Sequence, residues 1–198
     1  ISREIGDRGG EGTALGNLGM AYADLGEVRR AIGDYEQHLE IASEINDRRG
    51  EGIALGNLGV AYAELGEARR AIGYYEQALA IAREIGDRRG EGRALGSLGV
   101  AYAALGDARR AIGYHEQALA IAREIGDRHN EGNWLGTLGI SYHTLGEMGR
   151  AIGTFEQALE TAREIGDRRG EGNCLGILGN AYSALGEVGR AIEHYEQA

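Results

Sequence analysis

Residues 51–90 read EGIALGNLGVAYAELGEARRAIGYYEQALAIAREIGDRRG, and this 40-residue block recurs along the chain without insertion or deletion. A fixed period of this length is typical of arrays in which each repeat is one supersecondary unit and neighbouring repeats bury its apolar face. We therefore predict a single array over residues 1–198, with residues 1–10 as the end of a preceding repeat. The repeats cover residues 11–50, 51–90, 91–130, 131–170 and, in part, 171–198.

Each repeat carries two apolar stripes of helical period, which predict two helices. In the second repeat, Leu55, Leu58 and Tyr62 mark the first stripe, and the second stripe begins at Ala71. Strand signals are absent, and the short connections favour antiparallel neighbours. First helices are expected near residues 8–25, 48–65, 88–105, 128–145 and 168–185, and second helices near 27–45, 67–85, 107–125, 147–165 and 187–198.

The predicted helix ends carry residues with particular backbone preferences. Gly66 and Gly86 follow the two stripes of the second repeat, and Asn46 stands at the place of Gly86 one repeat earlier. Gly and Asn tolerate a positive φ, so these positions predict left-handed helix caps. An aspartate precedes each first helix and is expected to cap its N-terminus. These residues are Asp7, Asp47, Asp87, Asp127 and Asp167.

The composition agrees with a packed helical array and excludes several classes of protein. The 198 residues include 35 Gly but no Pro, and 42% are apolar, which is enough for a core. A net charge of −10 disfavours nucleic acid and anionic membranes as partners. Cys174 is the one cysteine, so an internal disulfide is not expected. No apolar run has the length of a membrane span, and a cytoplasmic location is expected.

The spacing within each repeat resembles the tetratricopeptide repeat (TPR), whose signature is W-x2-L-G-x2-Y, then A-x3-F, then A-x4-P. Leu55 replaces the Trp, Tyr75 replaces the Phe, and Arg83 stands where the Pro would be, so the second helix is longer. This form is similar to the arrays of Pins-type spindle-orientation adaptors, kinesin light chains and bacterial NB-ARC signalling ATPases. The resemblance implies an all-α fold, a right-handed α-solenoid (TPR superhelix) of antiparallel helix pairs. The direct matches are Gly59, Tyr62, Ala71 and Ala78.

Comparison of the repeats with one another separates positions that agree from positions that differ. On the first helices the differing positions are spaced by 4, 3 and 4 residues, which places them on one helical face. In TPR proteins this face lines the groove that holds a partner peptide, so the resemblance implies a peptide-binding role for it. We call these residues the variable stripe. Its members are Thr13, Asn17, Met20, Asp24, Ile53, Asn57, Val60, Glu64, Arg93, Ser97, Val100, Asn133, Thr137, Ile140, Thr144, Asn173, Ile177 and Asn180.

The variable stripe combines amides, charges and apolar side chains. Asn17 and Asn57 lie at one level, where an amide can both donate to and accept from the backbone of an extended peptide. Arg93 is suited to hold a carboxylate, whereas Asp24 and Glu64 favour a basic residue in the partner. The competing interpretation is that these are ordinary solvated residues that have drifted between repeats.

Three bulky substitutions interrupt the pattern. Trp134 replaces an alanine, and it is either an exposed anchor for a partner or a filler between stacked repeats. His38 stands where the next repeat has Ala78, and His115 stands at the place of Tyr75. We interpret both histidines as packing substitutions.

No pattern of catalytic or cofactor-binding residues is visible. All 21 basic residues are Arg, so the lysine of a P-loop is missing. No strand precedes the glycine-rich junction Gly50-Glu51-Gly52, which disfavours a dinucleotide fold. The histidines form no H-x3-H pair, and Cys174 has no His or Cys nearby in sequence. We therefore expect no enzyme activity, no cofactor and no metal.

The sequence thus predicts a protein–protein interaction module that binds a peptide segment of a partner in its groove, within a larger signalling or scaffold protein. The alternative is a self-assembling scaffold. Two residues after Ala198 would complete the period, and the next would correspond to Ile1, so chains could stack head to tail. A contact of that kind does not close and gives filaments.

Overall fold

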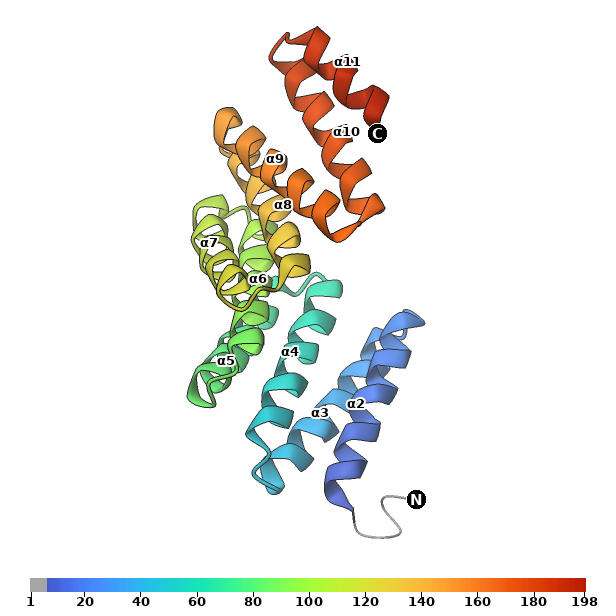
Figure 1. Cartoon of the computed structure of the whole chain (residues 1–198). Helices are drawn as coiled ribbons and strands as arrows, with labels where there is room; N and C mark the ends of the chain where they lie inside the picture. Colours follow the sequence, from blue (N-terminus) through green and yellow to red (C-terminus); the bar gives the residue numbers. More distant parts are fainter. Residues whose placement is uncertain (1–6) are drawn as a thin grey trace. The chain divides into compact units, whose positions relative to one another are not determined.

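The computed structural model describes residues 7–198, which form ten helices and no strand (Figure 1). The all-α prediction is confirmed, and the helices end within about one residue of the expected bounds. Residues 1–6 of the predicted preceding repeat lie outside the described residues. The first helices are α2 (Arg8–Asp24), α4 (Arg48–Glu64), α6 (Arg88–Ala104), α8 (Arg128–Thr144) and α10 (Arg168–Ala184). The second helices are α3 (Val28–Glu44), α5 (Ala68–Glu84), α7 (Ala108–Glu124), α9 (Met148–Ile165) and α11 (Val188–Gln197).

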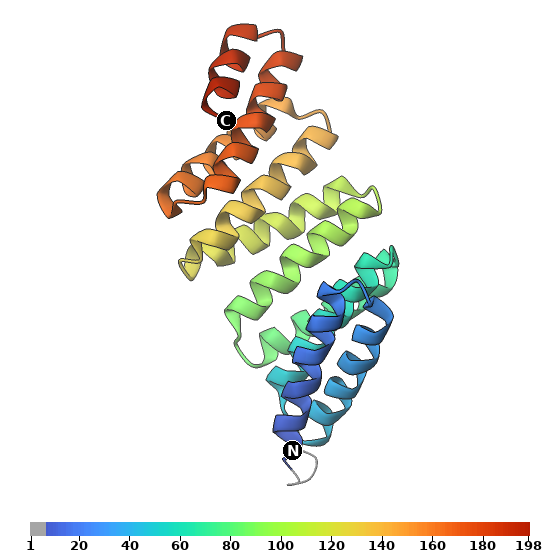
Figure 2. The same cartoon turned by 90° about the vertical axis from the view of Figure 1, so that its right-hand side faces the viewer.

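The chain forms two compact parts that are described separately, an N-terminal part up to Leu105 and a C-terminal part from Gly106. The N-terminal part holds α2–α6 and the C-terminal part holds α7–α11. The helix pair α2–α3, drawn in blue, lies side by side in both views (Figure 1 and Figure 2). Arg48 at the start of α4 forms an ion pair with Glu84 at the end of α5, as two helices of opposite direction require.

The core of the N-terminal part lies between successive helix pairs. Helix α4 packs on α3 and α5 and also touches α2 and α6. Leu58 is fully buried, and the Tyr75 ring lies directly against the backbone of α4 at Gly59. A Cβ atom at Gly59 would lie 2.6 Å from Cδ1 of Tyr75, so the absence of a side chain there permits the close packing.

The core of the C-terminal part is built from the same positions. Leu135, Phe155 and Leu175 are buried in one cluster, and Trp134 packs against it. The Trp134 ring also stacks on His115, with 6.2 Å between ring centroids. Because Trp134 is in contact with the core and His115 is only 1% exposed, the structure favours packing roles for both residues.

The helix ends have the predicted geometry. The φ angles of Gly66 and Gly86 are 74° and 70°, and Asn46 has a φ of 57°. The Asp47 carboxylate accepts a hydrogen bond from the Gly50 amide at 2.9 Å, which satisfies one of the free N–H groups of the first turn. Local residues that need no tertiary contact therefore mark where the first helices start and where the helices from α2 to α10 end.

Recurring charges connect successive helix pairs. In the N-terminal part, Arg83 of α5 donates to the Glu91 carboxylate of α6 at 2.9 Å, and Arg88 pairs with the same carboxylate. Burial alone would raise the pKa of Glu91, but the hydrogen bonds from Arg83 and Arg88 outweigh it and lower the pKa. Arg123 and Glu131 form the equivalent bond at 2.8 Å in the C-terminal part. These charges serve the stacking of repeats.

Candidate functional site

Most apolar members of the variable stripe lie on the exposed face of the first helices, whereas Ile177 of α10 packs against the C-terminal core. Met20, Val60 and Val100 occupy equivalent positions on α2, α4 and α6, and each is between 47% and 48% exposed. In the C-terminal part, Ile140 of α8 is 54% exposed. A large apolar side chain stays exposed at the same level of four of the five first helices, and Asn180 takes this position in α10. This exposure makes the face suitable for contact with a partner.

The polar members of the stripe divide into two groups. Some are already bonded within the chain: Thr13 and Thr144 donate to carbonyls of their own helices, and Asn180 accepts from the Tyr195 hydroxyl at 2.7 Å. Four asparagines have side-chain amides without a partner among residues 7–198, and these amides can bind a ligand. They are Asn17, Asn57, Asn133 and Asn173.

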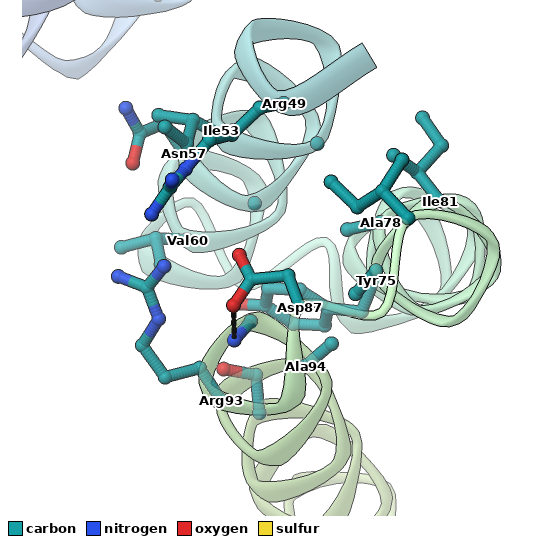
Figure 3. A pocket seen from close by; sticks show the side chains of 16 residues that line it. Arg49, Ile53, Asn57, Val60, Tyr75, Ala78, Ile81, Asp87, Arg93 and Ala94 are labelled. Atoms are coloured by element: carbon teal, nitrogen blue, oxygen red, sulfur yellow. Dashed lines mark hydrogen bonds between the residues drawn. The ribbon is translucent and has the colours of Figure 1, made fainter.

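A pocket of about 160 Å³ lies between α4 and α6 in the N-terminal part (Figure 3). Helix α5 forms its floor with Tyr75, Ala78 and Ile81. Five members of the variable stripe, which the sequence placed on two separate helices, line this one pocket. They are Ile53, Asn57 and Val60 from α4 and Arg93 and Ser97 from α6.

The pocket exists because several lining residues are small. A Cβ atom added at Gly56 would meet nothing within 4 Å, so this glycine leaves the opening wide. At Gly52 a Cβ would lie 3.3 Å from Cγ2 of Ile81, so this glycine permits α4 and α5 to pack closely. Ala78 and Ala94 likewise leave space that larger side chains would fill.

Two arginines border the pocket. Arg93 was a predicted site residue, whereas Arg49 was missed. Figure 3 shows both guanidinium groups on the same side of the pocket as the Asn57 amide. Neither arginine has a hydrogen-bond or ion-pair partner within the described part of the chain. Arg49 lies one helical turn before Ile53 and differs between repeats, so extending the stripe by one turn would have found it.

The other two titratable groups of the pocket, Asp87 and Tyr75, already interact with neighbouring groups of the chain. The Asp87 carboxylate accepts from the Gly90 amide at 2.9 Å as the cap of α6. Burial raises the pKa of Tyr75 to about 12, and a hydrogen bond with Ser97 opposes that rise only in part. The phenol therefore stays neutral at physiological pH. With Arg49, Arg93 and Asp87 as its charged lining, the pocket is net positive on a chain of net charge −10.

The pocket does not gather the whole stripe. Thr13, Asn17, Met20 and Asp24 lie on α2, and Glu64 and Val100 lie elsewhere on α4 and α6. The remaining members belong to α8 and α10 of the C-terminal part. Residues 7–198 contain no cluster of three His, Cys, Asp or Glu side chains that could hold a metal ion. In the same range no helix has both the length and the apolar character needed to cross a membrane.

Antiparallel helix pairs of fixed period, with a variable and exposed face on the first helix of each, define a helical repeat protein. The family model for the tetratricopeptide repeat matches residues 10–84, 55–124, 90–164 and 131–198. The chain therefore belongs to the tetratricopeptide repeat family, as the Leu-Gly-x2-Tyr spacing predicted. Comparison with the sequences of curated proteins gives no match.

Solved structures share this fold at low sequence identity. BtubC (BKLC) from P. vanneervenii has 21% identity and a TM-score of 0.87, over 98% of this chain and 81% of that one. A signal transduction ATPase with a tetratricopeptide repeat sensor, from Pyrococcus horikoshii, has 23% identity and a TM-score of 0.83, over 94% of this chain and 30% of that one. A Rap protein complexed with Competence and Sporulation Factor has 19% identity and a TM-score of 0.78, over 94% and 52%.

Proposed function

We propose that the protein is a non-catalytic interaction module that binds an extended peptide segment of a partner along the face of its first helices. The observation that carries this proposal is the convergence of five variable positions on one pocket, while invariant positions such as Leu55, Leu58 and Tyr62 are buried in the core. Residues that differ between otherwise equal repeats are free of the packing that the other positions serve. A Rap protein of similar fold was solved in complex with a factor, which supports a binding role.

The free asparagine amides would hold the peptide backbone. Asn17 and Asn57 lie at equivalent positions of α2 and α4, and neither side chain has a partner within residues 7–198. An extended peptide presents N–H and C=O groups that an amide can satisfy in pairs. Exposed Met20, Val60 and Val100 would supply apolar contact beside them. A preformed helical scaffold keeps the entropy cost of binding low on the protein side.

The test is a comparison of peptide capture by the wild type and an Asn17→Ala/Asn57→Ala variant. A displayed library of random dodecapeptides would first be selected on the full chain, and the enriched peptides would then be measured by fluorescence polarisation. Loss of two neutral hydrogen bonds, each contributing about 1 kcal/mol, should weaken binding roughly ten-fold or more.

The matched control is Gln37→Ala/Gln77→Ala, which removes two amides from the exposed face of the second helices α3 and α5. This variant should bind as the wild type does. Equal binding by the asparagine variant would exclude the backbone contact. Failure of the wild type to enrich any peptide would exclude peptide binding as the function.

A second candidate function, head-to-tail self-assembly, is favoured by two exposed apolar faces. Leu18 of α2 is 44% exposed, whereas its equivalent Leu58 is fully buried. Ile192 of α11 is 50% exposed, whereas its equivalent Ile72 is 9% exposed. We propose that α11 of one chain can pack on α2 of the next, as α3 packs on α4 within the chain.

If the chain self-assembles in this way, its weight-average mass should rise with concentration in sedimentation equilibrium. Leu18→Glu should abolish the rise, because a carboxylate would be buried without a partner. Exposed Leu145, which directly follows α8, provides the control, since Leu145→Glu should leave assembly unchanged. A wild-type chain that stays monomeric at high micromolar concentration would exclude this candidate.

A further inference from the structure

We propose that the pocket between α4 and α6 is an anchor site that takes one apolar side chain of the bound peptide together with a neighbouring carboxylate, and thereby fixes the register of the peptide. The inference rests on the proposed peptide-binding function and specifies its ligand. It is carried by the size and floor of the pocket, and by two unpaired arginines that do not recur together at the equivalent places within one part.

The floor of the pocket suits an apolar side chain. Ala78 and Ile81 of α5 and the ring of Tyr75 form it, and all three residues are at least 90% buried. An apolar cavity of about 150 Å³ can hold a benzene molecule, so a pocket of about 160 Å³ can hold one aliphatic or aromatic side chain. Because the backbone of α4 at Gly56 carries no side chain, the peptide can approach the opening closely.

The rim suits a single carboxylate. Arg49 and Arg93 border the pocket without a partner, and their guanidinium groups lie on one side of it (Figure 3). A guanidinium offers paired N–H donors that match the two oxygens of a carboxylate. Asp87 lies at the same pocket and reduces its net charge to +1, which matches a carboxylate better than a doubly charged phosphate.

The same space between two first helices occurs at two other places within a single part of the chain, between α2 and α4 and between α8 and α10. Neither of these places has an arginine at both positions. Between α2 and α4 the equivalents of Arg49 and Arg93 are Gly9 and Ile53. Between α8 and α10 the equivalents are His129 and Asn173. A carboxylate in the peptide therefore finds its two cations at one level only.

The space between the helices also differs among the equivalent places. In α3 the equivalent of Ala78 is His38, whose buried ring lies so close to α2 that a Cβ at Gly16 would be 2.9 Å from its Nδ1. Between α8 and α10 the equivalents of Ala78 and Ala94 are Ala158 and Cys174, so small residues remain there. Thr161 replaces the floor residue Ile81 at that place, which makes the floor less apolar. The pair of arginines therefore sets the register, because it occurs at one of these places only.

The experiment uses the random dodecapeptide library and the full-length chain. Peptides enriched on the wild type should carry Asp or Glu at a fixed spacing of one or two residues from an aliphatic or aromatic residue. Replacing that acidic residue by its amide should weaken binding to the wild type roughly ten-fold. An Arg49→Gln/Arg93→Gln variant should lose about the same affinity for the acidic peptide and none for its amide analogue.

Two variants close the pocket with residues that the chain already tolerates at equivalent positions. Ala78→His copies His38, and Ala94→Trp copies Trp134, so both should fold, and thermal melts followed by circular dichroism would verify this. Each should weaken binding of the enriched peptide at least ten-fold. The control for net charge is Arg29→Gln/Arg69→Gln on the second helices, where both arginines are exposed and line no part of the pocket. This control should bind as the wild type does.

The outcomes separate this inference from the proposed function. If the wild type enriches peptides without the acidic and apolar pair, or if folded Ala78→His and Arg49→Gln/Arg93→Gln variants bind them unchanged, the anchor site is wrong while peptide binding stands. A dependence on phosphorylated residues instead of Asp or Glu would likewise overturn it. If the wild type captures no peptide, the inference falls together with the proposed function.

Discussion

Gly59→Ala should lower the free energy of unfolding by roughly 2 kcal/mol or more. A Cβ atom at this position would lie 2.6 Å from Cδ1 and 2.9 Å from Cζ of Tyr75, whereas carbon atoms pack best at about 3.5–4.0 Å. The Tyr75 ring is only 5% exposed, so it cannot turn away without displacing its neighbours. Urea unfolding followed by circular dichroism would measure the loss.

The control is the same chemical change in the adjacent helix. A Cβ atom at Gly73 of α5 would meet nothing within 4 Å, so Gly73→Ala should raise the free energy of unfolding by about 0.5–1 kcal/mol through its helix propensity. The two substitutions should therefore act in opposite directions. A neutral or stabilising Gly59→Ala would show that the contact between the Tyr75 ring and the α4 backbone is not needed for stability.

The stability of the protein should fall as the pH falls from about 6.5 to about 4, chiefly because of His115. Burial lowers the pKa of His115 from 6.5 to about 4, so in this interval the unfolded chain takes up a proton that the folded chain does not. The loss should approach roughly 1.4 kcal/mol per pH unit, or about 3 kcal/mol in total. Burial also lowers the pKa of His38, with Asp47 opposing, so His38 adds to the same interval.

His115→Phe should remove most of this dependence, because Phe155 fills the equivalent position in the next repeat. Urea midpoints measured between pH 4 and pH 8 would show it, and an NMR titration of the imidazole would report the pKa directly. A His115→Phe variant with an unchanged pH profile would contradict the prediction.

A second loss of stability should follow at lower pH and should persist in His115→Phe. The pKa values of Glu91 and Glu131 are held below the usual value near 4.5 by arginine hydrogen bonds that outweigh burial. Their contribution is therefore complete above that pH and is lost as the pH falls through the lowered pKa values.

The fold could be predicted almost completely from the sequence because its determinants are local and repeated. Each first helix starts after an aspartate such as Asp47, and each helix from α2 to α10 is followed by a residue such as Gly66 that adopts a positive φ. The Leu-Gly-x2-Tyr spacing recurs in every repeat, so each of the five repeats independently predicts the same pair of helices. Short connections then left the antiparallel arrangement as the one that buries both stripes.

The candidate site could be predicted only in part. Variation between repeats identified the exposed face, including Asn57 and Arg93, because a residue free of packing is free to change. It did not identify Arg49, which lies one helical turn earlier in the same stripe. The sequence also left the orientation of Trp134 undecided, because a tryptophan at a position that is otherwise alanine can point to solvent or to the core. Its contacts with His115 and the C-terminal core favour the second possibility.

The sequence by itself determined the period, the helix bounds, the caps and the face that varies, since each depends on residues close together in the chain. Only the tertiary structure decided which variable residues meet. The pocket takes its floor from α5 and its sides from α4 and α6, and its volume depends on the absence of side chains at Gly56 and on the small size of Ala78 and Ala94. A space left between three helices is a property of their packing, so no single stretch of sequence contains it.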